Sequence, residues 1–505
     1  MPNVPGTWQA FATLIKIPWV APYVFWGSFE ETDQVMREKG DPETRTTRIT
    51  MSKSNALVIC DKDMLKEVLV VKNHIFHKPP HLYELFNTFG INILSNLDSG
   101  DDWKKHHKVA SNAFGTKNLE HMTSVAVNSV DLIRTFKWEK QIESALKKGE
   151  KGILLDANAD FSDITLDVLG KAGFGLDFSI FDDSNPEGMI FRRSLENMFT
   201  NGILLNHLFK DLVPFLHFAL PLAYKCFGVD KAVENVSTKL DEIINNRKKE
   251  LELNNDEVSD AQSNNEEKRD LLSLMVEANM TIEGKDRLTD LELKSDIYVF
   301  SLAGHETTST SLQWTLYELS KNESIQNKLR QEIDNYYGKG PNARKPYYDD
   351  FANLPYVTAV MLESLRLHPP VTGVFRTAKK DTTIGKYHVP KDTFLNLNIY
   401  SANRYEKNYE KPLEFNPERF PMDSESQTKK LHDFTLTSFS MGSRKCIGYR
   451  FALFEKFSIL CRMMQFYTFE LLNDENDVKD RVQPLPGVTV RPKNMRLLMK
   501  PRTDL

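Results

Sequence analysis

The stretch FSMGSRKCIG, from Phe439 to Gly448, sets one of only four cysteines in a turn-type segment beside two basic residues. A thiol in an apolar interior is normally inert, whereas a thiol close to cationic side chains is stabilised as the thiolate. Cys446, which follows Arg444 and Lys445, is therefore a candidate metal ligand or nucleophile. The other cysteines lack such surroundings and are predicted to be buried small apolar side chains: Cys60, Cys226 and Cys461.

Composition and charge place the chain among ordinary globular proteins. Its 505 residues are 40% hydrophobic and 27% charged, with a net charge of -5 at pH 7. An acidic balance of this kind argues against a nucleic-acid partner. Four cysteines in so long a chain do not make a disulfide framework, and no secretory signal opens the sequence, which together indicate a reducing compartment.

The first thirty residues hold three of the six tryptophans, Trp8, Trp19 and Trp26, but Lys16 and two prolines interrupt the run. A spanning helix needs about 20 consecutive apolar residues, which this segment lacks. Aromatic side chains interleaved with proline and lysine suit the headgroup region of a bilayer. Residues 1–40 are therefore predicted to form a segment at the membrane interface, with packing against the rest of the protein as the alternative.

Hydrophobic periodicity predicts a mainly α-helical fold with small peripheral β-sheets. Residues 46–60 indicate two short strands, followed by a helix that opens at Asp61, and the pattern is almost wholly helical from about residue 100 to residue 370. The polar, acidic tract 251–270 is predicted to be a solvated loop. Further strands are expected from Asp381, and residues 487–502 look like a C-terminal hairpin.

Small and polar residues interrupt the apolar pattern of a long helix predicted around residues 296–322, at the segment AGHETT. Gly304 and Thr307 are poor helix formers, and such local violations often mark function. Small residues, here Ala303 and Gly304, let a flat ligand approach the backbone. The Thr307 hydroxyl beside the Glu306 carboxylate can deliver protons to a bound group. A kinked core helix with a buried threonine is the alternative.

Two further motifs are ambiguous by themselves. Glu363 and Arg366 are three residues apart on a predicted helix and can form an ordinary surface pair, while Arg419 follows in a turn-rich loop. Trp103 and His107 are four apart in DDWKKHHKVA, so both can donate hydrogen bonds to one acidic group. A core tryptophan beside a solvated run of charges is the alternative for the second motif.

Taken together, these segments resemble the cytochrome P-450 family of haem-thiolate monooxygenases, of the eukaryotic microsomal type with fungal members included. The AGHETT segment is similar to the oxygen-activation motif of the family's long central helix, and the resemblance covers the chain from about residue 40 to its end. It implies one catalytic domain, residues 41–505, with haem between that helix and the cysteine loop. The haem loop is matched at Phe439, Gly442, Arg444, Cys446 and Gly448, and the structural triad at Glu363, Arg366 and Arg419.

The resemblance also assigns roles. Cys446 would be the proximal ligand of haem b (heme, iron protoporphyrin IX), because a thiolate pushes electron density to the iron and favours O–O cleavage. Thr307 and Glu306 would deliver protons during O₂ activation. Many relatives carry arginine where His107 stands, which implies weaker charge pairing at that position. The haem propionates would be held by Trp103, His107, Arg376 and Arg444, and the haem would also contact Phe439, Gly442, Gly448, Ala303 and Gly304.

The function implied is a membrane-associated monooxygenase that inserts one atom of O₂ into a hydrophobic or aromatic small molecule. Electrons would come from NADPH through a separate flavoprotein reductase, with cytochrome b5 as a possible second donor, because no dinucleotide fingerprint follows a strand in this chain. The expected location is the cytosolic face of the endoplasmic reticulum. The alternatives are a haem-thiolate isomerase or peroxygenase, a haem-binding sensor or carrier, and a helical scaffold without cofactor.

The resemblance also indicates where substrate and reductase would bind. The substrate pocket is expected at Phe86–Leu97, Phe300, Ala303, Val371–Phe375 and Val488–Val490, which are mainly apolar. Basic residues near the cysteine loop could steer an acidic reductase, although a solvated face is the usual meaning of such a charge run. These residues are Lys104, Lys105, Lys108, Lys445 and Arg450.

Overall fold

A computed structural model describes the chain over residues 6–7, 29–51, 54–181, 186–209, 214–257, 270–340, 342–423, 425–427, 436–485 and 487–504. The aromatic residues predicted to lie at a membrane interface, Trp8, Trp19 and Trp26, fall outside the described residues. The proposed boundary at residue 40 therefore stays a prediction.

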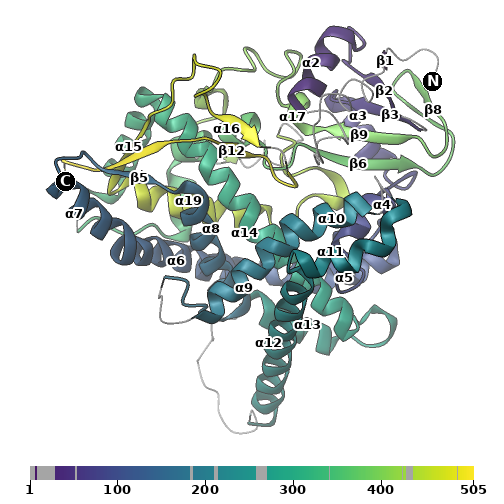
Figure 1. Cartoon of the computed structure of the whole chain (residues 1–505), viewed down its shortest axis with the longest axis horizontal. Coiled ribbons are helices and arrows are strands. Elements are labelled where there is room, and N and C mark those ends of the chain that lie inside the picture. Colours follow the sequence, from purple (N-terminus) through teal and green to yellow (C-terminus); the bar gives the residue numbers. More distant parts are fainter. Residues whose placement is uncertain are drawn as a thin grey trace.

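The helix α14 (Asp290–Lys321) is 32 residues long and runs through the middle of the molecule (Figure 1). A capping box starts it: the Thr289 hydroxyl accepts a hydrogen bond from the Glu292 N–H (3.2 Å), and the Glu292 carboxylate accepts one from the Thr289 N–H (2.9 Å). Most of its side chains are buried on every face, which explains why its sequence shows little amphipathic pattern. The predicted central helix is confirmed.

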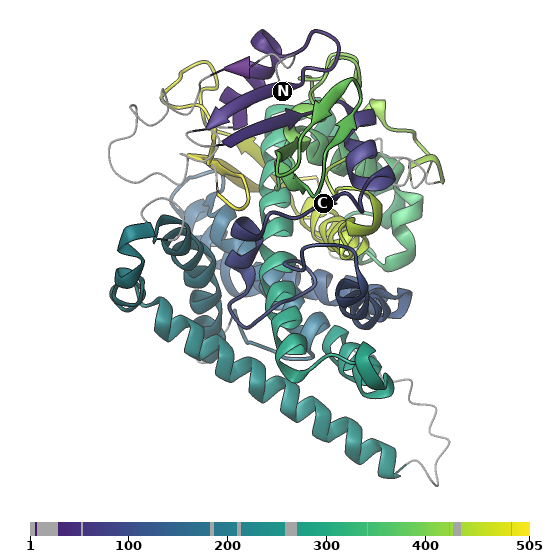
Figure 2. The same cartoon turned by 90° about the vertical axis from the view of Figure 1, so that its right-hand side faces the viewer.

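The other helices pack around α14, with α8, α16, α19 and α12 in direct contact with it. Figure 2 shows α12 extending away from the main body beside the lower end of α14. The longer helices are α2 (Phe29–Lys39), α5 (Asp101–Ser111), α6 (Thr116–Ile133), α7 (Glu139–Lys147), α8 (Ala157–Val168), α9 (Pro186–Asn197), α12 (Val229–Glu257), α13 (Leu271–Thr281), α15 (Glu323–Tyr337), α16 (Pro355–Leu367) and α19 (Tyr449–Met464). The shorter ones are α3 (Lys62–Lys66), α4 (Pro80–Tyr83), α10 (Ile203–His207), α11 (Leu220–Cys226) and α17 (Ile399–Ala402).

Small sheets lie at the periphery, as predicted (Figure 1). The largest has the order β1-β2-β3-β9-β6-β4, in which β2 and β3 form an antiparallel pair and β3 runs parallel to β9. Its strands are β1 (Gly6–Thr7), β2 (Thr47–Met51), β3 (Ser54–Ile59), β9 (Phe394–Asn398), β6 (Gly373–Ala378) and β4 (Phe76–His77). The smaller sheets are β10 (Tyr467–Leu471) with β13 (Leu497–Pro501) and β5 (Ile153–Leu155), β11 (Gln483–Leu485) with β12 (Arg491–Lys493), and β7 (Thr382–Ile384) with β8 (Tyr387–Val389).

Local chemistry explains the confirmed boundaries. Asp61 caps α3 by accepting hydrogen bonds from the N–H groups of Asp63 (3.0 Å) and Met64 (3.1 Å), as expected for a helix that opens at this residue. The strand pair before it has the predicted place in the sequence, β2 and β3. The mainly α fold class with small sheets is confirmed.

Three local predictions were wrong. Residues 487–502 do not form a hairpin by themselves: β12 pairs with the preceding strand β11, whereas β13 pairs with β10 and β5 in a different sheet. The first part of the tract predicted as a loop, residues 251–257, continues α12 as far as Glu257, since neither glycine nor proline stops the helix there, and residues 258–269 lie outside the described residues. Cys226 is exposed at the end of α11, whereas Cys60 and Cys461 are buried as predicted.

Candidate active site

The cysteine loop is folded back on itself just before α19. The Cys446 N–H donates to the carbonyl of Phe439 (2.9 Å), and the Lys445 N–H donates to the carbonyl of Gly442 (3.1 Å). Gly442 has a φ of +73°, and a Cβ at this position would lie 2.3 Å from the carbonyl oxygen of Leu69. Glycine is therefore required here both by conformation and by space.

The Cys446 thiol is placed to act as a ligand. Its Sγ accepts a hydrogen bond from the N–H of Gly448, the residue that precedes α19. Surrounding protein raises the pKa of the Cys446 thiol, while the Gly448 N–H and the Lys445 charge oppose that shift. The side chain is nevertheless exposed, whereas Cys461 on α19 is buried. An uncovered sulfur at a helix N-terminus suits a ligand thiolate.

Near the middle of α14, one face of the helix is exposed. Ala303 is exposed and Gly304 and Thr307 are partly exposed, although the flanking Leu302 and Thr308 are buried. A Cβ added at Gly304 would lie 3.3 Å from the Leu169 side chain, so this turn of the helix is also tightly packed. The small residues thus give a flat group access to backbone that larger side chains would cover.

Phe114 joins this part of α14 to the cysteine loop. Its ring lies 5.7 Å from that of Phe300 on α14 and 6.3 Å from that of Phe451 on α19. A Cβ at Gly448 would be in ordinary contact with Phe114 at 3.5 Å. The uncovered residues Cys446 and Ala303 therefore lie near the same junction between α14 and α19.

All four residues predicted to hold the propionates gather in one place. The Arg444 guanidinium lies 5.0 Å above the Trp103 ring, and the Trp103 ring is 4.7 Å from that of His107. Arg444 also donates to the carbonyl groups of Ile93 (3.0 Å) and Asn96 (2.9 Å), which fixes it over α5. Arg376, buried on β6, is close enough to Arg444 for their charges to repel.

Sequence reasoning missed a third cation in this group, Lys78. It is buried, its ammonium lies 4.5 Å from the centre of the Tyr83 ring, and it donates to the carbonyl of Leu94. Burial, and then the charges of Arg444 and Arg376, lower its pKa well below the ordinary value. A single lysine before two prolines carries no sequence signal of this role, because only the fold brings it to the two arginines.

The electrostatics of this group point to an anionic ligand. Burial and the charge of Arg376 lower the pKa of Arg444 to about 9, and burial lowers that of Arg376. Burial and the charge of Arg444 lower the pKa of His107. The nearby Asp98 is engaged with Lys379 at 3.2 Å. Buried cations that repel one another are stabilised by a bound anion, and a group with two carboxylates fits these donors.

The predicted proton-delivery residues are both present but do not contact each other. The Thr307 hydroxyl donates to the carbonyl of Ala303 (2.7 Å), and the Glu306 carboxylate accepts a hydrogen bond from the Thr489 hydroxyl (2.8 Å). Thr489 belongs to the connection between β11 and β12. The joint role of Thr307 and Glu306 stays a prediction.

A second acidic group close to α14 was missed. Glu455 on α19 is buried beside Thr308, and within the described part of the chain neither of its carboxylate oxygens has a hydrogen bond. Burial raises the pKa of Glu455 well above its ordinary value, with Thr308 opposing the shift in part. Because Glu455 follows Cys446 by nine residues, the sequence indicates that it lies on the helix after the cysteine loop. The sequence does not indicate that its side chain faces α14.

The triad predicted from the resemblance is a buried network rather than a surface pair. Arg366 donates to both oxygens of Glu363 (2.7 and 2.8 Å), and both side chains are fully buried. Arg419 donates to Glu363 at 2.9 Å. Arg366 also donates to the carbonyl groups of Asn403 and Pro412, each at 2.7 Å.

Residues 5–499 match the family model described as Cytochrome P450. The chain belongs to the cytochrome P450 family. As a P450 it is a haem-thiolate oxidoreductase that incorporates oxygen, and the residues around Cys446 fit the haem that the family implies.

Its relatives span animals and fungi. Cytochrome P450 3A6 of Oryctolagus cuniculus is 27% identical over 429 residues, which cover 83% of this chain and 78% of that protein. Cytochrome P450 monooxygenase 124 of Postia placenta is 28% identical over 459 residues, which cover 87% and 79%. The crystal structure of a cytochrome P450, CYP102L1, has a TM-score of 0.72 at 20% identity and covers 96% of this chain and 100% of that chain, which confirms the fold.

Proposed function

We propose that this P450 inserts one oxygen atom of O₂ into a hydrophobic or aromatic small molecule, with electrons from NADPH through a separate flavoprotein reductase. The observation that supports it most is the uncovered Cys446 sulfur beside the group of buried cations. When bound, haem would supply the iron at which O₂ is reduced and activated. Cys446 would ligate it, while Arg376, Arg444, Lys78, Trp103 and His107 would hold its two carboxylates.

Thr307 and Glu306 are proposed to control proton delivery on the α14 side. A hydroxyl on the uncovered face of the helix can pass a proton onward, and a carboxylate one residue before it can supply that proton from solvent. The Thr307 hydroxyl already donates to the Ala303 carbonyl, so its oxygen is left as an acceptor for a water or a substrate group.

The proposed substrate class rests on the apolar residues that the family resemblance assigns to the substrate pocket. Phe300 and Val490 are buried and apolar, and Val374 and Phe375 on β6 are partly exposed. Such a lining favours an apolar or aromatic molecule, with few polar groups to orient it. Val488 is 38% exposed, whereas Val490 is buried.

The reductase, or cytochrome b5 as a second donor, is proposed to dock near the cysteine loop. Lys445 lies next to Cys446, and its ammonium is 4.0 Å from the centre of the Tyr449 ring. The lysines of α5 are partly neutralised by the protein's own acids: Lys105 pairs with Glu292 at 2.7 Å. The attraction of a partner would therefore come from a modest local charge rather than a strong basic field.

We also propose contact with the cytosolic face of the endoplasmic reticulum membrane. Among the described residues, no helix combines the length and the apolar character needed to cross a bilayer. The segment at Pro214–Ala219 and α11 instead exposes large apolar side chains, with Phe215 at 74%, Phe218 at 79% and Leu222 at 65%. Apolar groups displayed in this way suit the interfacial region of a lipid surface.

The central test concerns Cys446. The ferrous carbon monoxide complex of the purified protein is expected to show the red-shifted Soret band of thiolate ligation, and Cys446→Ser is expected to abolish it because a hydroxyl does not replace a thiolate as donor. Cys226→Ser is the matched control, since Cys226 is exposed on α11 and should leave the band unchanged. A red-shifted band in Cys446→Ser would contradict the assignment. NADPH-independent turnover would instead support the isomerase or peroxygenase alternative.

A further inference from the structure

A hydrogen bond reaches Glu306 from a loop outside α14. We propose that Thr489 is a positioning residue that holds the Glu306 carboxylate in place and thereby determines how much of the electron supply ends in product. This inference rests on the proposed proton-delivery role of Glu306. It concerns residues 487–490, which connect β11 to β12.

The contact itself is short and protected. The Thr489 hydroxyl donates to Glu306 Oε1 at 2.8 Å, and Thr489 is only 5% exposed. A hydrogen bond from a neutral hydroxyl to a carboxylate is strengthened by the charge, and more so where water is excluded. Thr489 can therefore fix the orientation of a side chain that otherwise has several rotamers.

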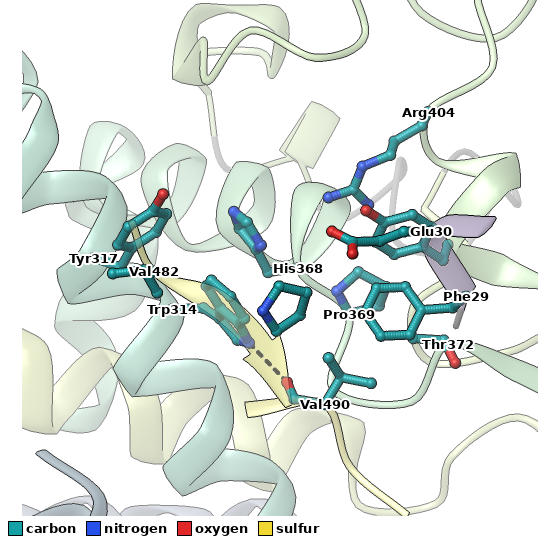
Figure 3. A pocket seen from close by; sticks show the side chains of 12 residues that line it. Phe29, Glu30, Trp314, Tyr317, His368, Pro369, Thr372, Arg404, Val482 and Val490 are labelled. Atoms are coloured by element: carbon teal, nitrogen blue, oxygen red, sulfur yellow. Dashed lines mark hydrogen bonds between the residues drawn. The ribbon is translucent and has the colours of Figure 1, made fainter. Parts of the chain in front are cut away.

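The loop that carries Thr489 is anchored at the next residue, Val490. The Val490 N–H donates to the carbonyl of Pro370 (2.9 Å), and the Trp314 indole donates to the carbonyl of Val490 (2.7 Å). Figure 3 shows this second bond beside a cavity of about 200 Å³ that Trp314 and Val490 help to line. Because both polar backbone groups of Val490 are occupied, the loop can hold the adjacent Thr489 side chain in a fixed direction.

Trp314 is in turn held firmly. Its ring stacks on that of His368 at 4.2 Å with 6° between the planes, and His368 shares a hydrogen bond of 2.6 Å with Glu318. Trp314 and Glu318 lie on α14, the same helix as Glu306. The loop is thus fixed to Trp314 on α14 and to the Pro370 carbonyl, so the distance from Thr489 to Glu306 is determined by rigid elements.

The position of the Glu306 carboxylate would affect the ratio of two reactions, which form either product or hydrogen peroxide. Productive turnover converts R–H, O₂, NADPH and one H⁺ to R–OH, H₂O and NADP⁺. Uncoupled turnover converts O₂, NADPH and one H⁺ to H₂O₂ and NADP⁺. Both consume the same electrons, so a misplaced proton donor changes the ratio of the products without changing the consumption of NADPH. Thr307 cannot compensate by holding Glu306, since its hydroxyl donates to Ala303.

The experiment uses the full chain with haem and a purified NADPH-dependent flavoprotein reductase. The probe is the first of 7-ethoxycoumarin, biphenyl, naphthalene or lauric acid that shifts the spin state of the haem spectrum. Thr489→Val removes the hydroxyl and keeps the shape, and Thr489→Ser restores a donor. The measured quantities are product and peroxide per NADPH, the spin-state titration and the carbon monoxide spectrum.

Thr489→Val is expected to lower product per NADPH by about threefold or more, with a matching rise in peroxide, while the spectrum and the affinity for the probe stay as in the parent. Thr489→Ser should recover most of the coupling. In a Glu306→Ala background, Thr489→Val should have no further effect, because it acts only through Glu306. Thr358→Val is the matched control, since the buried Thr358 hydroxyl has no hydrogen bond among the described residues.

The possible results distinguish the proton-delivery role of Glu306 and Thr307 from the positioning role of Thr489. If Glu306→Ala and Thr307→Ala leave coupling unchanged, the proposed proton-delivery role fails. If Glu306→Ala uncouples but Thr489→Val does not, only the positioning role fails. Equal uncoupling by Thr489→Val in the parent and in the Glu306→Ala background would also overturn the positioning role, because the effect would then not depend on the Glu306 carboxylate. A structural role would instead lower haem content or probe affinity in Thr489→Val.

Discussion

Glu455 shows how a single buried acid can affect both stability and the surroundings of the site. Its carboxyl lies between α19 and α14 next to Thr308, and the adjacent Lys456 is also buried and donates to Ser311 at 2.8 Å. Burial raises the pKa of Glu455 well above its ordinary value and lowers that of Lys456 well below its ordinary value, which favours the neutral form of each group. They pack the two helices together without forming an ion pair.

The raised pKa of Glu455 predicts a loss of stability with rising pH. A carboxyl whose pKa is higher in the folded state contributes stability that is complete below the unfolded value, about 4.3, and is lost as pH rises through the folded value. The free energy of unfolding should therefore fall by up to about 1.4 kcal/mol per pH unit over that range. Glu455→Gln does not titrate and should reduce this slope.

The measurement is the thermal midpoint of the haem-loaded parent and of Glu455→Gln at about pH 5.5 and about pH 8. The midpoint of the parent should drop more between the two conditions than that of the variant. Exposed Glu418, which pairs with Lys328, provides the control variant Glu418→Gln. Parallel changes in parent and Glu455→Gln would show that Glu455 is ionised in the folded protein.

At the scale of elements, α16 supports the segment that leads into the cysteine loop. Arg366 donates to the carbonyl of Asn403, and the Asn403 side chain donates to Ser438 (3.1 Å) and accepts from Thr437 (2.8 Å). Ser438 itself donates to the carbonyl of Leu365 at 2.8 Å. The chain that reaches Phe439 is therefore tied to α16 by side chains, which explains why a charged network this far from Cys446 can matter for the site.

We expect Arg366→Lys to disturb the cysteine loop, because the hydrogen bonds of Arg366 support the chain that leads into this loop. Lysine keeps the charge but cannot reproduce the planar set of donors, so carbonyl groups and Glu363 lose partners in a fully buried place. Breaking a buried pair costs about 3–5 kcal/mol, and the variant should contain less haem per protein and unfold at lower temperature. Haem content by pyridine haemochrome and the thermal midpoint are the measurements.

Arg496→Lys serves as the control for that variant. Arg496 is 50% exposed and pairs with Asp480, and exposed pairs of this kind are worth at most about 1 kcal/mol. A haem content in Arg366→Lys equal to that of Arg496→Lys would contradict the supporting role of α16.

The apolar surface formed by Phe215, Phe218 and Leu222 is a feature of the whole molecule. It is displayed at the segment that precedes α12, and α10 beside it contacts the turn at Glu84–Phe86. Full burial of one phenylalanine is worth about 1.5–3 kcal/mol, so two such side chains can account for a large part of the affinity for a lipid surface.

The double variant Phe215→Ser, Phe218→Ser is expected to bind vesicles of phosphatidylcholine and phosphatidylserine about tenfold more weakly than the parent, as measured by flotation. Leu413→Ser is the control, because Leu413 is also a highly exposed apolar side chain, at 65%, but lies far from this surface in the sequence. Unchanged flotation of the double variant would show that this surface does not contact the bilayer.

The amino-acid sequence by itself determined the features that depend on neighbouring residues. The loop around Cys446 requires glycine at position 442 for its positive φ, and α14 begins at a Thr289–Glu292 capping box. The helix start at Asp61 and the strands β2 and β3 also follow from local chemistry. These are contacts within a few residues, which propensity and turn chemistry describe well.

Only the tertiary structure decided which distant side chains meet. Lys78 reaches Arg376 and Arg444 because β4 and β6 pair in the same sheet, and the Thr489 hydroxyl finds Glu306 across 183 positions of the chain. The same applies to β13, which pairs with β5, more than 300 positions earlier in the chain. Burial, and therefore every shifted pKa at the site, depends on the packing of segments far apart in the sequence, and no local pattern encodes that packing.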